Sequence, residues 1–468
     1  MARFVGRSSM MAGLLALSCT LSCNSDTVGV PALDSCSDAG HGSVGCSFSL
    51  TRLLHLRVNE KDADAILVSN PSTEVTTQVQ LLRGDWGSER YELGPGEIHV
   101  FEFDSPAIAG ESTAREPRAA MRVIAEDPVA AYLLAPYANR TSNDGSLLIP
   151  DAALGRRYVA SSYAAFDNPS HPVVSGDPSY FMVVGQEDGT VVRFTPSVDT
   201  AGGDGIPAVS AGEQGEFVVD RDDAVRVAAI PFADISGTVI EADAPIWVAG
   251  AVGCAAVLDP DQTPSYCDHM QEVMRPIEQW GSEYVAVPAP RRAGEPHLWR
   301  IYAGAPQVSV SVDPAQPGFP LTLAQTGDRA ELVVPNGTVL TITGDGPILP
   351  VQYVVSERLA SGKGDSAMIQ AVPRTAWLDR YVVGTGLRYS INYVQIVRPE
   401  GGAAVFVDGV EVVGYRSEQT VEIADWSVSE GTHVVTSAEP FGLSSYGYSN
   451  DVDGTKRSAY ALPGGFSG

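Results

Sequence analysis

The feature that most constrains the fold of this chain is a short pattern that recurs four times along its 468 residues. In each copy an apolar run is followed by one to three acidic or small residues, then a proline, then a second apolar run. The prolines are Pro128, Pro245, Pro347 and Pro440, which are 117, 102 and 93 residues apart. Because acidic residues, glycine and proline favour chain reversal, we interpret each copy as a turn between two strands. Recurrence at this spacing predicts an internal repeat of about 100 residues.

A second proline pattern follows each of these turns and sets the limits of the repeats. In three copies a tyrosine opens a new strand eight residues after the proline, and the fourth proline is Pro463. The three pairs are Pro150 with Tyr158, Pro276 with Tyr284, and Pro373 with Tyr381. The sequence therefore predicts four β-repeats that span residues 50–150, 151–276, 277–373 and 374–468.

The runs between these prolines predict an all-β fold. They are short, rich in Val, Ile, Tyr and Thr, and bounded by Gly, Pro, Asn and Asp, as in residues 180–184 and 308–312. Helical periodicity does not extend beyond about three turns anywhere in the chain. About seven short strands in each repeat favour β-sandwich-like units in tandem. A closed β-propeller-like ring is the alternative, because four-stranded blades also space their turns evenly.

Charge excludes two classes of partner. The chain has 57 acidic and 30 basic residues, which gives a net charge of −27. Nucleic-acid binding requires basic patches that neutralise phosphates, and adhesion to anionic lipid requires the same sign of charge. We therefore expect no nucleic-acid partner and no membrane contact other than through a lipid anchor.

The N-terminus predicts export. Arg3 and Arg7 precede an apolar run over residues 10–21, which is too short to span a membrane and is typical of a signal peptide. The run ends near Cys23, which resembles a bacterial lipoprotein cleavage site, with Cys19 as the alternative anchor. We interpret residues 1–23 as a lipoprotein-type signal and residues 24–49 as a polar tether at the outer membrane or cell surface. An ordinary secretory signal with incidental cysteines is the other interpretation.

Four further cysteines predict disulfides, because an even number in an exported chain favours pairing. Three pairings are open, and the local one joins Cys36 to Cys46 and Cys254 to Cys267. Spacings of 10 and 13 residues without a histidine pair do not fit a zinc site.

One stretch resembles a known family. An apolar strand over residues 245–254 ends in Cys254, the second cysteine is followed by Asp268 and His269, and Pro276, Trp280 and Gly281 come next. These residues resemble the IgGFc-binding protein N-terminal domain family, with weaker similarity over roughly residues 50–468. The resemblance implies an extracellular, β-rich binding or scaffold module, and it brings no catalytic residues with it.

The pair Asp268 and His269 invites a catalytic interpretation, which needs a nucleophile and an oriented base. Ser265 is near in sequence, but no Gly-x-Ser-x-Gly pattern surrounds it. We expect instead that the disulfide pins a loop and that Asp268 caps a short helix that begins at Met270.

Calcium is the only cofactor that the sequence suggests. Asn450, Asp451 and Asp453 place three side-chain oxygens within four residues, although no EF-hand loop is complete. Solvated turns explain this cluster equally well.

We expect a non-catalytic binding or adhesion lipoprotein of the cell envelope, with a protein or glycan as its partner. An exported hydrolase whose site is assembled from loops of several repeats is one alternative. A purely structural module of a surface assembly is the other. Trp247 and Trp299 are expected in the core, and Trp280 and Trp377 between units.

Overall fold

The computed structural model describes residues 36, 42–55, 63–84, 87–104, 108, 110, 112–137, 142–166, 178–259, 267–386, 389–450 and 458–467. Within these ranges regular structure consists of antiparallel β-strands and three short 3-10 helices. In the same ranges no helix is long and apolar enough to cross a membrane. The fold is all-β, as the sequence predicts.

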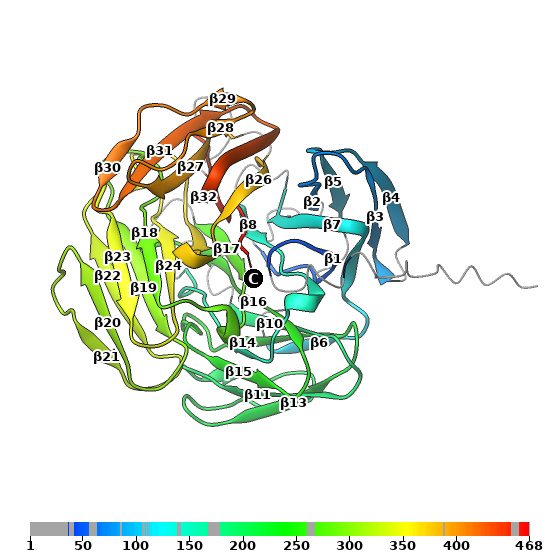
Figure 1. The fold of residues 1–468 in the computed structure, drawn as a ribbon. Helices are drawn as coiled ribbons and strands as arrows, with labels where there is room; N and C mark the ends of the chain where they lie inside the picture. The colour runs from blue at the N-terminus through cyan, green and yellow to red at the C-terminus, as the bar shows by residue number, and fades with distance from the viewer. Residues whose placement is uncertain are drawn as a thin grey trace, which may run out of the picture.

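Four β-sandwiches, which we call units 1 to 4, form a closed ring (Figure 1). Each unit has an outer sheet and an inner sheet, and the last strand of the inner sheet lies at the centre of the ring. Both architectures considered from the sequence are thus present, because the sandwiches themselves make up the ring.

In unit 1 the outer sheet has the order β4-β3-β7-β1 and the inner sheet the order β5-β2-β7-β8. The strands are β1 (Gly45–Leu50), β2 (Asp64–Ser69), β3 (Thr77–Leu82), β4 (Ser88–Leu93), β5 (Ile98–Phe103), β7 (Met121–Ala135) and β8 (Asp144–Leu147). Strand β6 (Ala114–Glu116) leaves unit 1 and pairs with β14 of unit 2. Residues 45–49 therefore belong to the ring and not to the tether that the sequence suggested.

Unit 2 repeats this topology, with outer order β13-β11-β15-β9 and inner order β12-β14-β10-β16-β17. Its elements are η3 (Asp151–Ala153), β9 (Arg157–Val159), β10 (Ser179–Gly185), β11 (Thr190–Thr195), β12 (Thr200–Ala201), β13 (Gly215–Val219), β14 (Ala224–Ala229), β15 (Val239–Ala242), β16 (Ile246–Ala255) and β17 (Asp268–Val273).

Unit 3 has outer order β21-β20-β23-β18 and inner order β22-β19-β24-β25. Its elements are η4 (Ile277–Gln279), β18 (Glu283–Ala286), β19 (His297–Ala303), β20 (Val308–Asp313), β21 (Leu321–Leu323), β22 (Arg329–Val334), β23 (Leu340–Gly344), β24 (Ile348–Val354) and β25 (Ala367–Gln370).

Unit 4 has outer order β29-β28-β32-β26 and inner order β30-β31-β27-β32-β33. Its elements are η5 (Arg374–Ala376), β26 (Leu378–Gly384), β27 (Ile391–Pro399), β28 (Val405–Val407), β29 (Val410–Glu411), β30 (Arg416–Glu418), β31 (Val421–Val428), β32 (Thr432–Tyr448) and β33 (Ala459–Pro463).

The four recurring prolines mark corners where a strand crosses from one sheet to the other, so the expected chain reversal is wrong. In units 1 and 4 a single long strand, β7 or β32, passes through Pro128 or Pro440 and pairs with both sheets. In units 2 and 3 the strand is interrupted before Pro245 and Pro347, between β15 and β16 and between β23 and β24. Proline lacks an N–H, so it suits the position where one ladder ends and the next begins.

The repeated tyrosines explain the eight-residue spacing. Each hydroxyl accepts a hydrogen bond from the backbone N–H three residues earlier and donates one to the carbonyl just after the corner proline. For Tyr284 both distances, to Gly281 N and Ile348 O, are 2.8 Å. Unit 1 has Phe48 in place of the tyrosine, so it lacks the hydroxyl group. There the first strand pairs directly with the residue after the corner proline, with Gly45 opposite Val129. The tyrosine thus joins the first strand of a unit to its corner.

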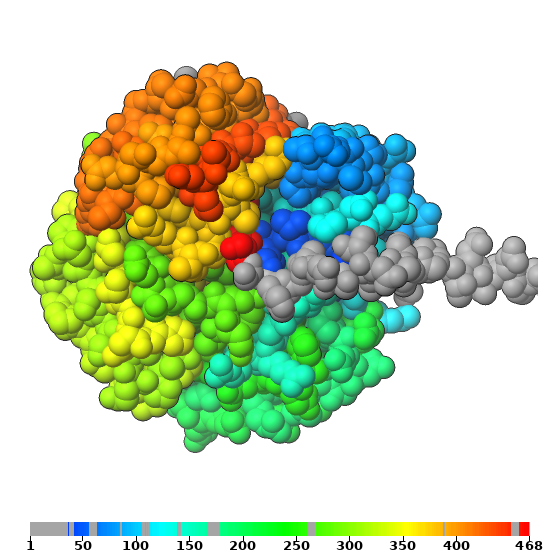
Figure 2. All heavy atoms as spheres, viewed as in Figure 1, coloured from blue at the N-terminus to red at the C-terminus, as the bar shows by residue number. Residues whose placement is uncertain are grey.

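Two kinds of apolar cluster hold the ring together. Within a unit, side chains from the inner and outer sheets meet, as in the cluster around Phe181, Val192 and Ile240 in unit 2. Between units, inner sheets pack on one another, and unit 1 closes the ring by packing against residues of units 2 and 4. Strands β8 and β25 each contact both β17 and β33, and the C-terminal residues lie near the middle (Figure 2).

Candidate functional site at the disulfide and the ring centre

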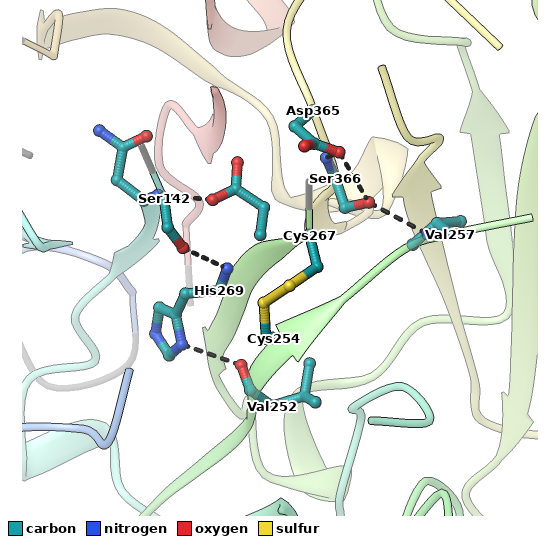
Figure 3. Close-up of a disulfide and its surroundings, with 10 residues drawn as sticks. Ser142, Val252, Cys254, Val257, Cys267, His269, Asp365 and Ser366 are labelled. Atoms are coloured by element: carbon teal, nitrogen blue, oxygen red, sulfur yellow. Dashed lines mark hydrogen bonds between the residues drawn. A yellow bond between two sulfur atoms is a disulfide. The ribbon is translucent and has the colours of Figure 1, made fainter. Parts of the chain in front are cut away.

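The disulfide between Cys254 and Cys267 joins β16 to the residue before β17 (Figure 3). Both cysteines are buried and pack against Phe166. A second disulfide links Cys36 to Cys46 in β1. The two bonds expected from the cysteine count are therefore present, and both join residues close in sequence.

Asp268 is the first residue of strand β17, so the expectation that it caps a helix is wrong. Residues 268–273 pair with β16 and are all buried, and this pairing overrides the local helical preference of Met, Gln and Glu. Its Oδ1 accepts a hydrogen bond of 2.8 Å from the backbone N–H of Asn143 in unit 1. Burial and the nearby Asp365 carboxylate hold the pKa of Asp268 well above its usual range.

His269 is fully buried and its side chain is enclosed by hydrogen-bond partners. Ring Nδ1 lies 2.9 Å from the carbonyl oxygen of Val252, and Nε2 lies 3.1 Å from Oε1 of Gln271. Ser142 Oγ accepts a hydrogen bond from the backbone N–H of His269, not from the ring (Figure 3). Burial, assisted by His55, lowers the pKa of His269 to about 4, so the ring is neutral. Because each ring nitrogen faces one of these buried oxygens, neither nitrogen is open to a substrate. Ser265 lies outside the described residues.

The centre of the ring holds further buried carboxylates that sequence reasoning did not single out. Asp144 Oδ2 accepts hydrogen bonds from the backbone N–H groups of Gln271, at 3.2 Å, and Met368, at 3.1 Å, so it links β8, β17 and β25. Glu272 accepts bonds from the backbone and side-chain amides of Gln370. Burial raises the pKa of Glu272 to about 8 and that of Asp144 well above its usual range.

Asp365 completes this set, and a sequence signal for it exists. Asp268 and Asp365 each stand eight residues before the repeated proline, Pro276 or Pro373, so they occupy equivalent positions in units 2 and 3. Burial raises the pKa of Asp365 to about 7. The equivalent positions of Asp268 and Asp365 could have been recognised by aligning the repeats. That the two side chains lie close together at the centre of the ring could not be predicted from the sequence.

The other residues of the resemblance lie at the seams between units. Trp280 is buried among side chains of units 2 and 3, and its Nε1 donates to the carbonyl of Arg275 at 3.0 Å. A Cβ on Gly281 would lie 2.7 Å from Cβ of Pro373, and a Cβ on Gly155 would lie 2.4 Å from Cβ of Pro276. Trp377 packs between units 3 and 4, and Trp247 and Trp299 are in the core, as predicted. These residues fix how neighbouring units pack.

Two hollows open at the surface. One, of about 550 Å³, is lined by Trp280, Gly281, Ser282, Glu283, Pro347, Arg374 and Thr375. Since it includes residues from the start of unit 3, its corner and the start of unit 4, we call it the η4–η5 hollow. The other, of about 420 Å³, lies between units 1 and 2, where Arg122 donates to Asp222. Both combine charged and apolar side chains.

Two sequence predictions fall largely outside the described residues. Cys19 and Cys23 lie there, as do Asp451 and Asp453 of the calcium candidate. Asn450 is described, and it forms an isolated antiparallel bridge with Lys363. Among the described residues no group of three or more His, Cys, Asp or Glu side chains is arranged to hold a metal ion.

The fold and the two disulfides together define an all-β module of the extracellular type. The family model described as IgGFc binding protein matches residues 144–447, and the chain belongs to this family. The match runs from the first residue of β8 into β32, so it includes the disulfide and the central strands β8, β17 and β25. No curated protein matches the chain.

Proposed function

We propose that this protein is an exported, lipid-anchored module of the cell surface or outer membrane that binds a protein partner without catalysing a reaction. The observation that carries the proposal is the location of the residues that resemble the family. Asp268 and His269 are sealed in the ring centre, and Pro276, Trp280 and Gly281 serve the seams. A scaffold of this kind presents loops and hollows to a partner and keeps them rigid.

The anchor assigned to Cys23 fits this architecture. Strand β1 begins at Gly45, so residues 24–44 would separate the ring from a lipidated Cys23. The disulfide from Cys36 to Cys46 would tie the end of that tether to the ring. Lipid attachment at Cys23 and a location at the outer membrane or cell surface both belong to this proposal.

The η4–η5 hollow is the contact site that we favour. Ser282, Glu283 and Thr375 are exposed there, while Trp280 beneath them is anchored by its bond to Arg275. Arginine side chains such as Arg374 are typical of the residues that dominate protein interfaces, and Trp280 lines the same hollow from the seam between units. A glycan is the other partner class, and the binding test separates the two.

The test uses the chain from residue 24 onward, because a bait that begins inside β1 would lose Cys46 and a strand of the ring. The bait is used to capture material from envelope and extracellular fractions, and each captured protein is purified and its binding measured directly. Antibody Fc is included as a defined probe because of the family's description. A protein that binds the wild-type chain and binds Ser282→Trp at least ~10-fold more weakly supports the proposal.

The matched control is Ser88→Trp, which fills the other hollow. Equal binding of a partner to wild type and both variants would move the contact elsewhere on the ring. If carbohydrate is captured and no protein partner is found, the partner is a glycan and not a protein. Hydrolysis of the captured material would overturn the non-catalytic assignment.

A further inference from the structure

Three buried side-chain oxygens near the centre of the ring have no hydrogen-bond partner in the part of the chain that the structure describes. They are Oδ2 of Asp268, Oδ2 of Asp365 and Oδ1 of Asn143. Asp268 and Asp365 are 0% exposed and Asn143 is 4% exposed. A buried polar atom without a partner costs about 1–3 kcal/mol, and a charged one costs more, so each such atom in a native protein requires an explanation.

The three oxygens belong to one neighbourhood. Asn143 N–H donates to the other oxygen of Asp268, and Asp365 lies near enough to Asp268 to raise the pKa of its carboxyl group. Ser366, the neighbour of Asp365, accepts a hydrogen bond of 3.1 Å from the backbone N–H of Val257, three residues after Cys254 (Figure 3). Strands β17 and β25, which begin at or just after these two carboxylates, contact each other.

The surrounding charges do not neutralise this pair. Asp144 and Glu357 add negative charge around Asp268 and Asp365, whereas the neutral Ser142 hydroxyl hydrogen-bonds the Asp268 carboxyl group. The guanidinium of Arg292 donates to the backbone carbonyl of Asp365 at 3.4 Å, and it forms an ion pair of 3.3 Å with Glu295. Two buried carboxylates that lack a cation are unstable as a pair of anions.

We propose that Asp268, Asp365 and Asn143 bind one Ca²⁺ ion at the centre of the ring. All three donors are oxygens, with no nitrogen or sulfur, which is the ligand type that Ca²⁺ takes. Two carboxylates balance its charge, and a set of two carboxylates and one amide is consistent with the lack of three acidic, His or Cys ligands among the described residues.

Such an ion would connect three units, since Asn143 belongs to unit 1, Asp268 to unit 2 and Asp365 to unit 3. Tyr389 of unit 4 lies near two of these residues, Asp268 and Asn143. The ion would therefore act where all four units converge, and the ring would be held at its centre by calcium as well as by apolar packing.

The experiment measures Ca²⁺ binding by equilibrium dialysis and calorimetry on the full mature chain, after removal of metal with a chelator. We expect about one Ca²⁺ per chain, a higher Tm with Ca²⁺ than with chelator, and at least ~10-fold weaker binding in Asp365→Asn and Asp268→Asn. Glu272→Gln is the matched control, because that buried carboxylate has both oxygens satisfied by Gln370. A second control, Asp451→Asn with Asp453→Asn, removes the other calcium candidate.

Loss of the ion in the Asp365 or Asp268 variant, with binding retained in both controls, supports the site. If one of these two variants does not fold, the test rests on Ca²⁺ binding by the other variant and on the number of Ca²⁺ ions bound per wild-type chain. Absence of Ca²⁺ binding in the wild type, or binding lost only in the Asp451 and Asp453 variant, overturns the proposal. So does an Asp365→Asn chain that is more stable than a calcium-insensitive wild type, which would indicate that the carboxylates share a proton instead.

Discussion

Replacing Tyr284 by phenylalanine tests the link between the two proline patterns. The hydroxyl accepts from Gly281 N and donates to Ile348 O, and Tyr284 is 0% exposed. Without the hydroxyl, both backbone groups lose their partner in a site where water cannot replace it. Leaving a buried hydrogen-bonding group unpaired costs about 1–3 kcal/mol, so we expect Tyr284→Phe to lower the free energy of unfolding by about 2 kcal/mol.

The assay is urea denaturation followed by tryptophan fluorescence, with hydrogen exchange of β18 and β24 to locate the loss. Tyr448→Phe is the matched control, because Tyr448 is also buried and its hydroxyl has no hydrogen-bond partner. Its removal relieves an unsatisfied group and should leave stability unchanged or slightly higher. If Tyr284→Phe and Tyr448→Phe change stability equally, the tyrosine bridge contributes nothing and the reasoning fails.

Two further predictions rest on the structure, and a third rests on the N-terminal sequence. Non-reducing peptide mapping should link Cys254 to Cys267, and Cys254→Ser should lower the unfolding free energy by about 3 kcal/mol; free thiols at both positions would contradict the bond. Cys23→Ser should release the protein from membranes while Cys19→Ser should not, as measured by fractionation. Burial raises the pKa of Glu272 to about 8 in the folded chain, above its unfolded value of 4.5, so its stabilising contribution is complete below pH 4.5 and is lost as pH rises through 8. Tm should therefore fall more steeply between pH 5 and 8 in the wild type than in Glu272→Gln, and parallel curves would refute this assignment.

Local sequence patterns predicted the strands and the repeat. Both the alternation of apolar and polar residues and the recurring prolines can be recognised within short segments. The role of Pro245 and Pro347 could not be read in the same way. A tight turn and a corner between two sheets use the same residues, and only the partners of the flanking strands distinguish them.

The central site was harder to predict for a related reason. Asp268 was visible beside a cysteine, but its partner Asn143 is 125 residues away and Asp365 belongs to the next unit. Whether residues 268–273 form a helix or a strand is decided by pairing with β16, which overrides local preference. Conversely, Tyr158, Tyr284 and Tyr381 were recognised by spacing alone, since the same contact constrains each repeat.

The central claim is that the interior of the ring holds the fold together and that the exterior binds the partner. The most direct measurement is the Kd of a captured protein partner for the wild type, Ser282→Trp at the η4–η5 hollow, and Glu272→Gln at the centre. We predict at least ~10-fold weaker binding for Ser282→Trp and an unchanged Kd for Glu272→Gln. A Kd that changes for the folded Glu272→Gln variant but not for Ser282→Trp would contradict the account.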